Sequence, residues 1–213
     1  MREILRLIET DVFLVPSTDI LFNQYNDNDQ NDITNGSEIR KDNLRRYIQS
    51  FRTPPSIVLV GEAPGFHGCR FSGVPFTDER NLLDGIPIIG EKSSVGPERK
   101  KERSAGTVWS VLAQYRTQLF IWNCIPFHPH TPGDNSQNRT PTNIEFSNHK
   151  NILRGILRSL GPQHVFAVGK RAETTLSNIN IKSDYIRHPA HGGDKIFKNT
   201  MSRRLNEITQ VHS

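Results

Sequence analysis

Cysteine is scarce in this sequence, since the 213 residues include only Cys69 and Cys124. Two thiolates cannot supply the four ligands of a typical structural zinc site or iron–sulfur cluster. They also argue against a disulfide scaffold, and a pair of reduced thiols is typical of a cytoplasmic protein. A chain of this length can bury enough surface to fold on its own core, so we expect neither a metal nor a cofactor.

Long apolar runs are missing as well. The longest of them, such as Ile57 to Val60, are far shorter than the roughly 20 residues that span a bilayer. Charged residues interrupt the apolar stretch in residues 1–11, MREILRLIETD, which is unlike a signal peptide. These absences argue against membrane insertion and against secretion.

Acidic residues are outnumbered by basic ones. The chain has 27 Lys and Arg against 22 Asp and Glu, a net charge of +5, and a pI near 9.4. The excess is concentrated from Lys170 onward, where eight basic residues accompany four acidic ones. Such a distribution points weakly to a polyanionic partner. A solvated basic face explains it equally well, so charge alone does not define a function.

Short apolar, β-branched runs alternate with amphipathic segments over about 130 residues. This alternation predicts an α/β fold, a three-layer α/β/α domain with a central, mainly parallel four-stranded sheet. A capping box, formed by Thr142 and Glu145, marks the start of the clearest helix. The expected strands cover residues 56–60, 119–122, 164–168 and 184–187, and the expected helices cover residues 2–9, 38–51, 107–115, 143–160 and 170–177.

We expect a single domain over residues 1–213, in which residues 1–55 form an N-terminal extension of helices and loops. Residues 23–35 are rich in Asn and Asp and almost free of apolar side chains, so they should form a loop. Residues 91–103 carry many charges and should form a mobile surface loop.

The sequences that follow the expected strands are the place to look for function, because ligands of parallel sheets bind at the carboxyl ends of the strands. Four motifs stand there. They read GEAPG at 61–65 with GVPF at 73–76, NCIPFHPH at 123–130 with NRTPT at 138–142, GKR at 169–171, and HPAHGG at 188–193.

In this order, each after an expected strand, the four motifs closely resemble those of the uracil-DNA glycosylase superfamily. The nearest match is the branch whose first motif is GEAPG, and the resemblance covers residues 57 to about 197. It implies a hydrolase of base excision repair, a DNA glycosylase that flips uracil, or a wider range of deaminated bases, out of the duplex. The enzyme would then hydrolyse the N-glycosidic bond and leave an abasic site. The implied partner is DNA that contains such a base, and the protein should act as a monomer.

The resemblance also implies roles for individual residues. Phe76 would stack on the flipped base, Asn123 would read its edge, and His188 would donate a hydrogen bond to O2 of the departing base. Glu62 would steady the cationic sugar and orient the attacking water. The other implied contacts are Gly61, Ala63 and Phe66 with the base, and Gly169, Lys170, Arg171, Arg139, His191 and Gly192 with the DNA backbone.

The sequence departs from that branch in several ways. The N-terminal cysteines of the iron–sulfur enzymes are absent, so apolar packing of the N-terminal helices should replace the cluster. No acidic residue follows GEAPG in residues 66–69, so either Phe66 closes the pocket or the base range is broader. Ala63 stands where many members activate water with Asp or Asn, which leaves Glu62, or an acid such as Asp78, for that task. HPAHGG also has no apolar residue to wedge into the emptied base stack.

Other interpretations stay open at this level. Phe76 could be a core residue, Asn123 a turn cap, and His188 an ordinary buried histidine. The protein could be a catalytically weak or inactive nucleic-acid-binding member of the same fold, or a hydrolase of a free nucleoside or another small ligand. The least favoured interpretation is a metal site that combines Cys69, Cys124, His67, His128 and His130.

Overall fold

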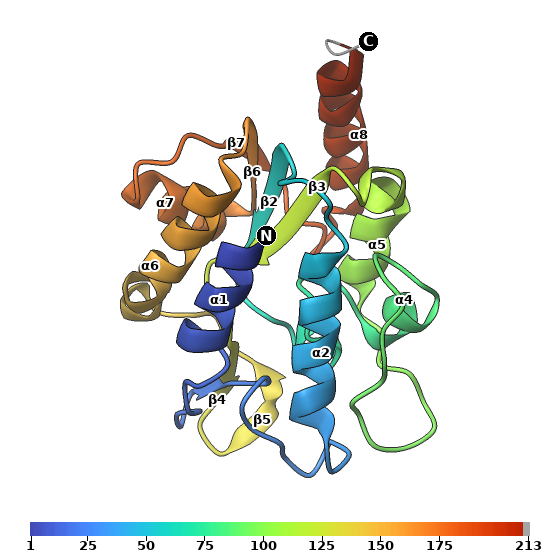
Figure 1. Ribbon diagram of the computed structural model, residues 1–213, viewed down its shortest axis with the longest axis vertical. Helices are drawn as coiled ribbons and strands as arrows, with labels where there is room; N and C mark the ends of the chain where they lie inside the picture. Colours follow the sequence, from blue (N-terminus) through green and yellow to red (C-terminus); the bar gives the residue numbers. More distant parts are fainter. Residues whose placement is uncertain (211–213) are drawn as a thin grey trace.

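The computed structural model describes residues 1–210 and has a four-stranded sheet at its centre (Figure 1). All neighbouring strands are parallel, in the order β3-β2-β6-β7. These strands are β2 (Ile57–Gly61), β3 (Leu119–Asn123), β6 (His164–Val168) and β7 (Asp184–Ile186). The four strands expected from the sequence are thus confirmed. Every residue of β2 and β3 is buried, as in strands covered by helices on both faces, whereas the edge strand β7 leaves Tyr185 exposed.

The sheet separates two apolar cores. In β2, Val58 and Val60 face one core while Ile57 and Leu59 face the other, as the period of two in a strand requires. The first core is covered by α1 (Arg2–Asp11), α2 (Gly36–Gln49), α6 (Asn143–Leu160) and α7 (Lys170–Asn178), and the second by α5 (Arg103–Leu112) and α8 (Asp194–Gln210). The α/β/α arrangement predicted from the sequence is therefore confirmed (Figure 1).

Several elements have no counterpart among the expected ones. A small antiparallel sheet has the strand order β1-β4-β5 and lies at the end of the molecule opposite α8 in Figure 1. Its strands are short, and β4 and β5 are mostly polar, which hides them from a hydropathy pattern. The expected helix 107–115 ends as the 3-10 helix η1 (Ala113–Tyr115), and the additional elements are β1 (Leu21–Phe22), β4 (His128–Thr131), β5 (Asp134–Asn138), α3 (Cys69–Ser72), α4 (Glu79–Leu83) and α8.

Helix α6 begins at the expected capping box. The hydroxyl of Thr142 accepts a hydrogen bond from the N–H of Glu145 at 3.3 Å, and the Glu145 carboxylate accepts one from the N–H of Thr142 at 2.6 Å. Gly161, with φ of 57°, ends the helix in the left-handed conformation. Both boundaries therefore follow from local chemistry.

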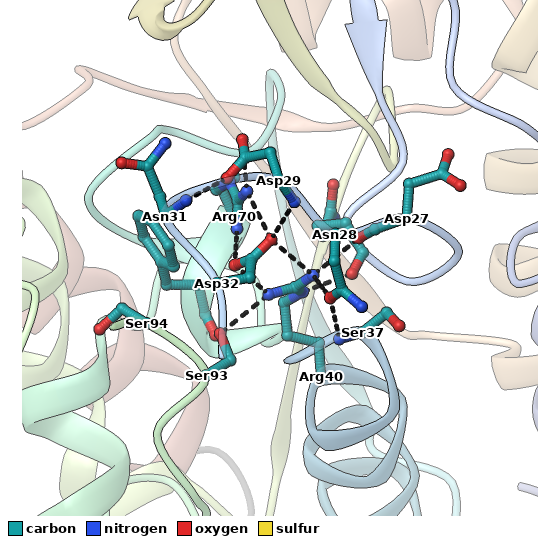
Figure 2. A network of polar contacts seen from close by, with 12 residues as sticks. Asp27, Asn28, Asp29, Asn31, Asp32, Ser37, Arg40, Arg70, Ser93 and Ser94 are labelled. Atoms are coloured by element: carbon teal, nitrogen blue, oxygen red, sulfur yellow. Dashed lines mark hydrogen bonds and ion pairs between the residues drawn. The ribbon is translucent and has the colours of Figure 1, made fainter. Parts of the chain in front are cut away.

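The Asn- and Asp-rich segment 23–35 contains a single isolated β-bridge at Asp32 and is otherwise a loop, as expected. Buried ion pairs order it (Figure 2). The Asp32 carboxylate binds Arg40 at 2.7 Å and Arg70 at 2.6 Å, and all three side chains are inaccessible to solvent. Asp29 adds a contact of 2.9 Å to Arg70. Because Arg70 follows Cys69 in α3, this network fastens the N-terminal segment to the chain just after GEAPG.

Apolar packing of the N-terminal helices is therefore only part of what joins residues 1–55 to the sheet. Ile4 and Ile8 of α1 and Tyr47 of α2 lie in the first core, as the sequence suggested. The Asp32–Arg70 pair adds a polar connection, which is tolerated in the interior because each charge has a close partner.

Segment 91–103 is exposed in its middle but firmly held at both ends. The backbone N–H groups of Ser93, Ser94 and Lys100 donate to the buried carboxylate of Glu79 at 2.9, 2.9 and 3.0 Å. The N–H of Glu102 donates to Asp78 at 2.8 Å. The segment is therefore attached to the start of α4 at both ends, which a run of charged residues does not reveal.

Candidate active site

A small cavity of about 40 Å³ opens where β2 and β3 end. Four segments that are distant in the sequence meet there: the loops after β2 and β7, the end of β3, and the start of α5. The residues that line it are Glu62, Ala63, Gly65, Cys69, Phe76, Glu102, Ser104, Asn123 and His188. Five of these, Glu62, Ala63, Phe76, Asn123 and His188, are among the site residues inferred from the sequence.

Gly61 supports this cavity through its small size. It lies opposite Asn123 in the β2–β3 register, and a Cβ atom on Gly61 would overlap the ring of Phe76 and approach Oδ1 of Asn123 to 2.7 Å. A glycine is therefore required for the aromatic ring and the carboxamide to come together. The first residue of GEAPG contributes space, without a side chain of its own.

Phe76 reaches the cavity from a strained backbone. Its φ of 52° lies in the left-handed region, which is costly for a residue with a side chain and is often found at functional sites. The ring packs with the second core and lies with its centroid 6.0 Å from that of His188. Phe76 is thus both a core residue and part of the cavity wall.

His188 is oriented by its own loop. Its Nδ1 accepts a hydrogen bond from the backbone N–H of Ala190 at 3.1 Å, so the proton of a neutral ring must be on Nε2. Burial, together with the positive charges of the nearby Arg187 and His191, lowers the pKa of His188 to about 4. A Cβ atom on Gly193 would overlap the carbonyl oxygen of His188, which explains the second glycine of HPAHGG.

Glu62 is the acidic residue of the first motif, and it is partly buried. Burial raises the pKa of its carboxyl, and the guanidinium of Arg171 opposes this effect. Arg171 is therefore close enough to influence the cavity electrostatically. Ala63 beside Glu62 also lines the cavity, but its methyl group has no proton to exchange.

Sequence reasoning missed Gly65, Cys69, Ser104 and, above all, Glu102. Glu102 lies in the charged run KKER at 100–103, whose composition is typical of an exposed loop. The glycines at 65 and 68 were the one available signal, because they mark a place where another group approaches the backbone. Burial raises the pKa of the Cys69 thiol, which makes it a poor nucleophile.

Two other residues that the sequence offered lie elsewhere. The Phe66 ring packs against Phe71 and His128 and is not part of the cavity lining. Both carboxylate oxygens of Asp78 accept backbone hydrogen bonds, one from Asn81 as the N-cap of α4 and one from Glu102. Phe66 therefore does not close the base cavity, and Asp78 is occupied as a structural acceptor.

The residues implied to hold the DNA backbone are divided between two environments. Gly169 caps the N-terminus of α7, and the neighbouring Lys170 and Arg171 are exposed at the surface. His191 and Gly192 form an exposed turn in the left-handed conformation, with φ of 52° and 77°. These groups thus belong to the loop that follows His188 and to the start of α7.

Arg139 has a different environment. Its guanidinium donates to both carboxylate oxygens of Glu145 at 2.6 and 3.0 Å and to the carbonyl oxygens of Ile20 and His130. Since these internal bonds engage all of its nitrogens, Arg139 ties the small sheet to α6. A contact between this guanidinium and DNA stays a prediction, and it would have to form beside these internal bonds.

The suggested metal ligands do not meet. Within residues 1–210, no group of three or more His, Cys, Asp or Glu side chains is placed to hold a metal ion. His128 illustrates the reason, because its two ring nitrogens face the carbonyl oxygens of Pro64 and Asn135 at 2.9 and 3.0 Å. In the same part of the chain, no helix is long and apolar enough to cross a membrane.

Comparisons with known proteins identify both the fold and the family of this chain. The crystal structure of wild-type Pedobacter heparinus SMUG2 has the same fold, with a TM-score of 0.72 over 98% of this chain and 97% of that one, at 15% sequence identity. The match includes the N-terminal segment, which the sequence motifs left unexplained. A model of the uracil DNA glycosylase superfamily matches residues 49–210. The motifs at the ends of the strands are thus part of a family pattern over most of the sequence, and the chain belongs to the uracil DNA glycosylase superfamily.

Proposed function

We propose that this protein is a DNA glycosylase that takes a flipped uracil into the cavity and hydrolyses its N-glycosidic bond. The observation that carries the proposal is the convergence of Glu62, Phe76, Asn123 and His188 on one small cavity. The superfamily consists of DNA glycosylases, so the reaction class agrees with the family match. A base in the duplex is inaccessible to such a cavity, so the nucleotide must first leave the stack.

Recognition of the base is assigned to Phe76 and Asn123. The aromatic face suits a flat pyrimidine, and the carboxamide offers a donor and an acceptor in one plane. Uracil presents O4 and N3–H to such a group, whereas cytosine presents the opposite pattern. Gly61 holds the two side chains at contact distance, so the specificity depends on a rigid element of the sheet.

Stabilisation of the leaving group is assigned to His188. Negative charge develops on O2 of the base as the glycosidic bond breaks, and an N–H donor aimed at this atom acts most strongly in the transition state. The bond from Ala190 to Nδ1 leaves Nε2–H as the donor. Because the pKa of His188 is lowered to about 4, the ring is a neutral donor at neutral pH and brings no charge into the base cavity.

Stabilisation of the sugar is assigned to Glu62. Cleavage leaves cationic character on the sugar ring, which an adjacent carboxylate favours, and the same oxygen atoms can orient the attacking water. Ala63 cannot share this task. Arg171 and Lys170, exposed at the start of α7, would bind phosphates on the DNA strand that carries the flipped nucleotide.

Incubation with labelled single- and double-stranded oligonucleotides that carry one uracil, hypoxanthine or xanthine tests the proposal. Alkaline cleavage at the resulting abasic site reports excision, and an unmodified oligonucleotide of the same sequence is the control. Uracil release from DNA is the expected result. Tight binding to uracil-containing DNA without any release would instead identify a binding protein, and release from the free nucleoside alone would identify a small-molecule hydrolase.

A further inference from the structure

Glu102 is an acidic residue of the cavity wall that the mechanism above does not use. Its carboxyl lies against the backbone of the loop after β2. A Cβ atom on Gly65 would approach one carboxyl oxygen to 2.6 Å, and a Cβ atom on Gly68 would overlap the other oxygen. The two glycines therefore leave a space that the Glu102 carboxyl fills, next to the position of the base.

The position of this carboxyl is fixed by its neighbours. The backbone N–H of Glu102 donates to Asp78, which is itself held as the N-cap of α4, and the Ser104 side chain forms a hydrogen bond with the carboxyl. Helix α5 begins at the next residue. Glu102 thus projects from the junction of two anchored elements, which gives it the rigidity that a specificity residue requires.

The charge state of the Glu102 carboxyl is also compatible with a position beside the base. Burial and the nearby Asp78 raise the pKa of Glu102, which favours its neutral form. A neutral carboxyl does not repel the negative charge that develops on a departing base. The group can therefore form part of the wall without opposing the reaction.

The edge of the base that Glu102 meets follows by elimination, and this step rests on the proposed function. Asn123 takes N3–H and O4 of uracil, His188 takes O2, and N1 bears the sugar beside Glu62. The C5–C6 edge is left for the rest of the lining. That remainder consists of Ala63, Gly65, Cys69, Ser104 and Glu102, of which Glu102 has the largest side chain.

We propose that Glu102 is a specificity-determining residue, whose side chain occupies the space beyond C5 of a flipped pyrimidine and excludes bases that carry a substituent there. The cavity is small, and the Glu102 side chain forms part of its wall, so shortening this side chain would enlarge the cavity on that side. The specificity of the site thus depends on a residue that joins it from a separate surface segment, 40 positions after Glu62.

Three variants of the full chain test this assignment. Glu102→Ala removes the carboxyl, Glu102→Gln keeps its size and replaces it by an uncharged amide, and Glu98→Ala changes an exposed acid of the same segment as the control. Binding is measured to duplexes with 2′-fluoro-deoxyuridine or its 5-methyl counterpart opposite guanine, since the fluorine slows cleavage. Single-turnover excision of uracil and thymine opposite guanine is measured in parallel.

The parent, Glu98→Ala and Glu102→Gln should all favour the base without the methyl group by about tenfold or more. Glu102→Ala should reduce this preference at least tenfold, mainly through better binding and excision of the methylated base. An unchanged preference in Glu102→Ala would overturn the assignment. Loss of the preference in Glu102→Gln would do so too, because the volume would then not be what matters.

Binding of the fluorinated duplexes and single-turnover excision together distinguish a failure of this inference from a failure of the proposed function. A parent protein that binds the fluorinated uracil duplex selectively but excises no uracil would refute the hydrolytic activity, and the binding preferences would still test Glu102. If the parent does not distinguish either modified duplex from unmodified DNA, both proposals fail. Glu102→Gln also keeps the test valid if Glu102→Ala does not fold, which thermal unfolding would show.

Discussion

The backbone N–H of Ala190 donates a hydrogen bond to Nδ1 of His188 across 3.1 Å. This short contact within one loop decides which nitrogen of the ring carries the proton, and so which end of the imidazole can act as a donor to a bound base. It also explains why the residue two positions after the histidine can be an alanine, since only its backbone takes part.

Replacement of His188 by Ala should slow single-turnover uracil excision by roughly 10²–10³-fold, with little change in DNA affinity. The lost hydrogen bond strengthens only as the glycosidic bond breaks, so the ground-state complex is scarcely affected. Rapid-quench kinetics and a binding titration measure the two effects. His164→Ala is the control. His164 is the first residue of β6, whereas the cavity lies at the carboxyl ends of the strands, so this variant should keep the parent rate. Excision at the parent rate by His188→Ala would contradict the leaving-group assignment.

The pH dependence of the chemical step should report Glu62. Its pKa is raised above the ordinary 4.5, and the carboxylate is the active form, so the rate should fall as the pH drops through this raised pKa. Glu62→Gln should lose roughly 10²-fold or more in rate and show no such decline. Because His188 titrates near 4, no ionisation should appear around 6.5. An acid limb that persists in Glu62→Gln would assign it to another group.

Arg171 should have two separable effects. Arg171→Ala removes a phosphate contact, so affinity should fall for all DNA sequences alike and the salt dependence of binding should lose about one unit of slope. It also removes a positive charge that lowers the pKa of Glu62, so the acid limb should move to higher pH. Lys182→Ala, another exposed position in the basic C-terminal part, is the matched control. Unchanged salt dependence would place the DNA backbone elsewhere.

Gly61→Ala should abolish base recognition. The added methyl group would overlap the Phe76 ring and crowd Asn123, and overpacking of this kind costs about 1–3 kcal/mol of stability. Uracil excision should therefore fall far more than the melting temperature does. Gly106→Ala, within helix α5, approaches only the flexible end of Arg80 and should preserve activity. Normal excision by Gly61→Ala would show that the cavity relaxes around the methyl group.

The buried ion network should be important for stability. Asp32→Ala leaves Arg40 and Arg70 without their shared partner in the interior, which should lower the free energy of unfolding by about 3–5 kcal/mol. Asp84→Ala breaks the exposed pair with Arg99 and should cost less than about 1 kcal/mol. Denaturant unfolding measures both. A small effect of Asp32→Ala would mean that water reaches the two guanidinium groups.

Local sequence patterns were sufficient for the central sheet. The strands at 57–61 and 119–123 are apolar at every position before their last residue, and both faces of such a strand must be covered by helices. The capping box of Thr142 and Glu145 likewise fixed the start of α6, because its two hydrogen bonds join residues three positions apart. Helix α8 was not predicted, although its buried Phe197, Met201 and Leu205 recur every four positions, the spacing of an amphipathic helix.

The residues of the cavity also differ in whether their sequence context predicted their position. Glu62, Asn123 and His188 lie at or just beyond the ends of strands, and the parallel arrangement of the sheet brings its carboxyl ends together at one edge. Arg139 also follows a strand and belongs to a recognisable motif, yet its donors are used by Glu145 and three carbonyl groups. A motif reveals which side chain is present but not which partner has already bound it.

The sequence by itself therefore determined the four strands of the central sheet, five of the helices, the motifs at the strand ends, and the members of the cavity that those motifs contain. These features depend on hydropathy and capping within a few residues of each other. Only the tertiary structure decided that Glu102 lines the cavity, that Asp32 binds two buried arginines, and that Glu145 binds the guanidinium of Arg139. Each of these depends on a contact between segments that are distant in the chain or on competition among partners, and the burial that selects the winning partner exists only once the whole core has formed.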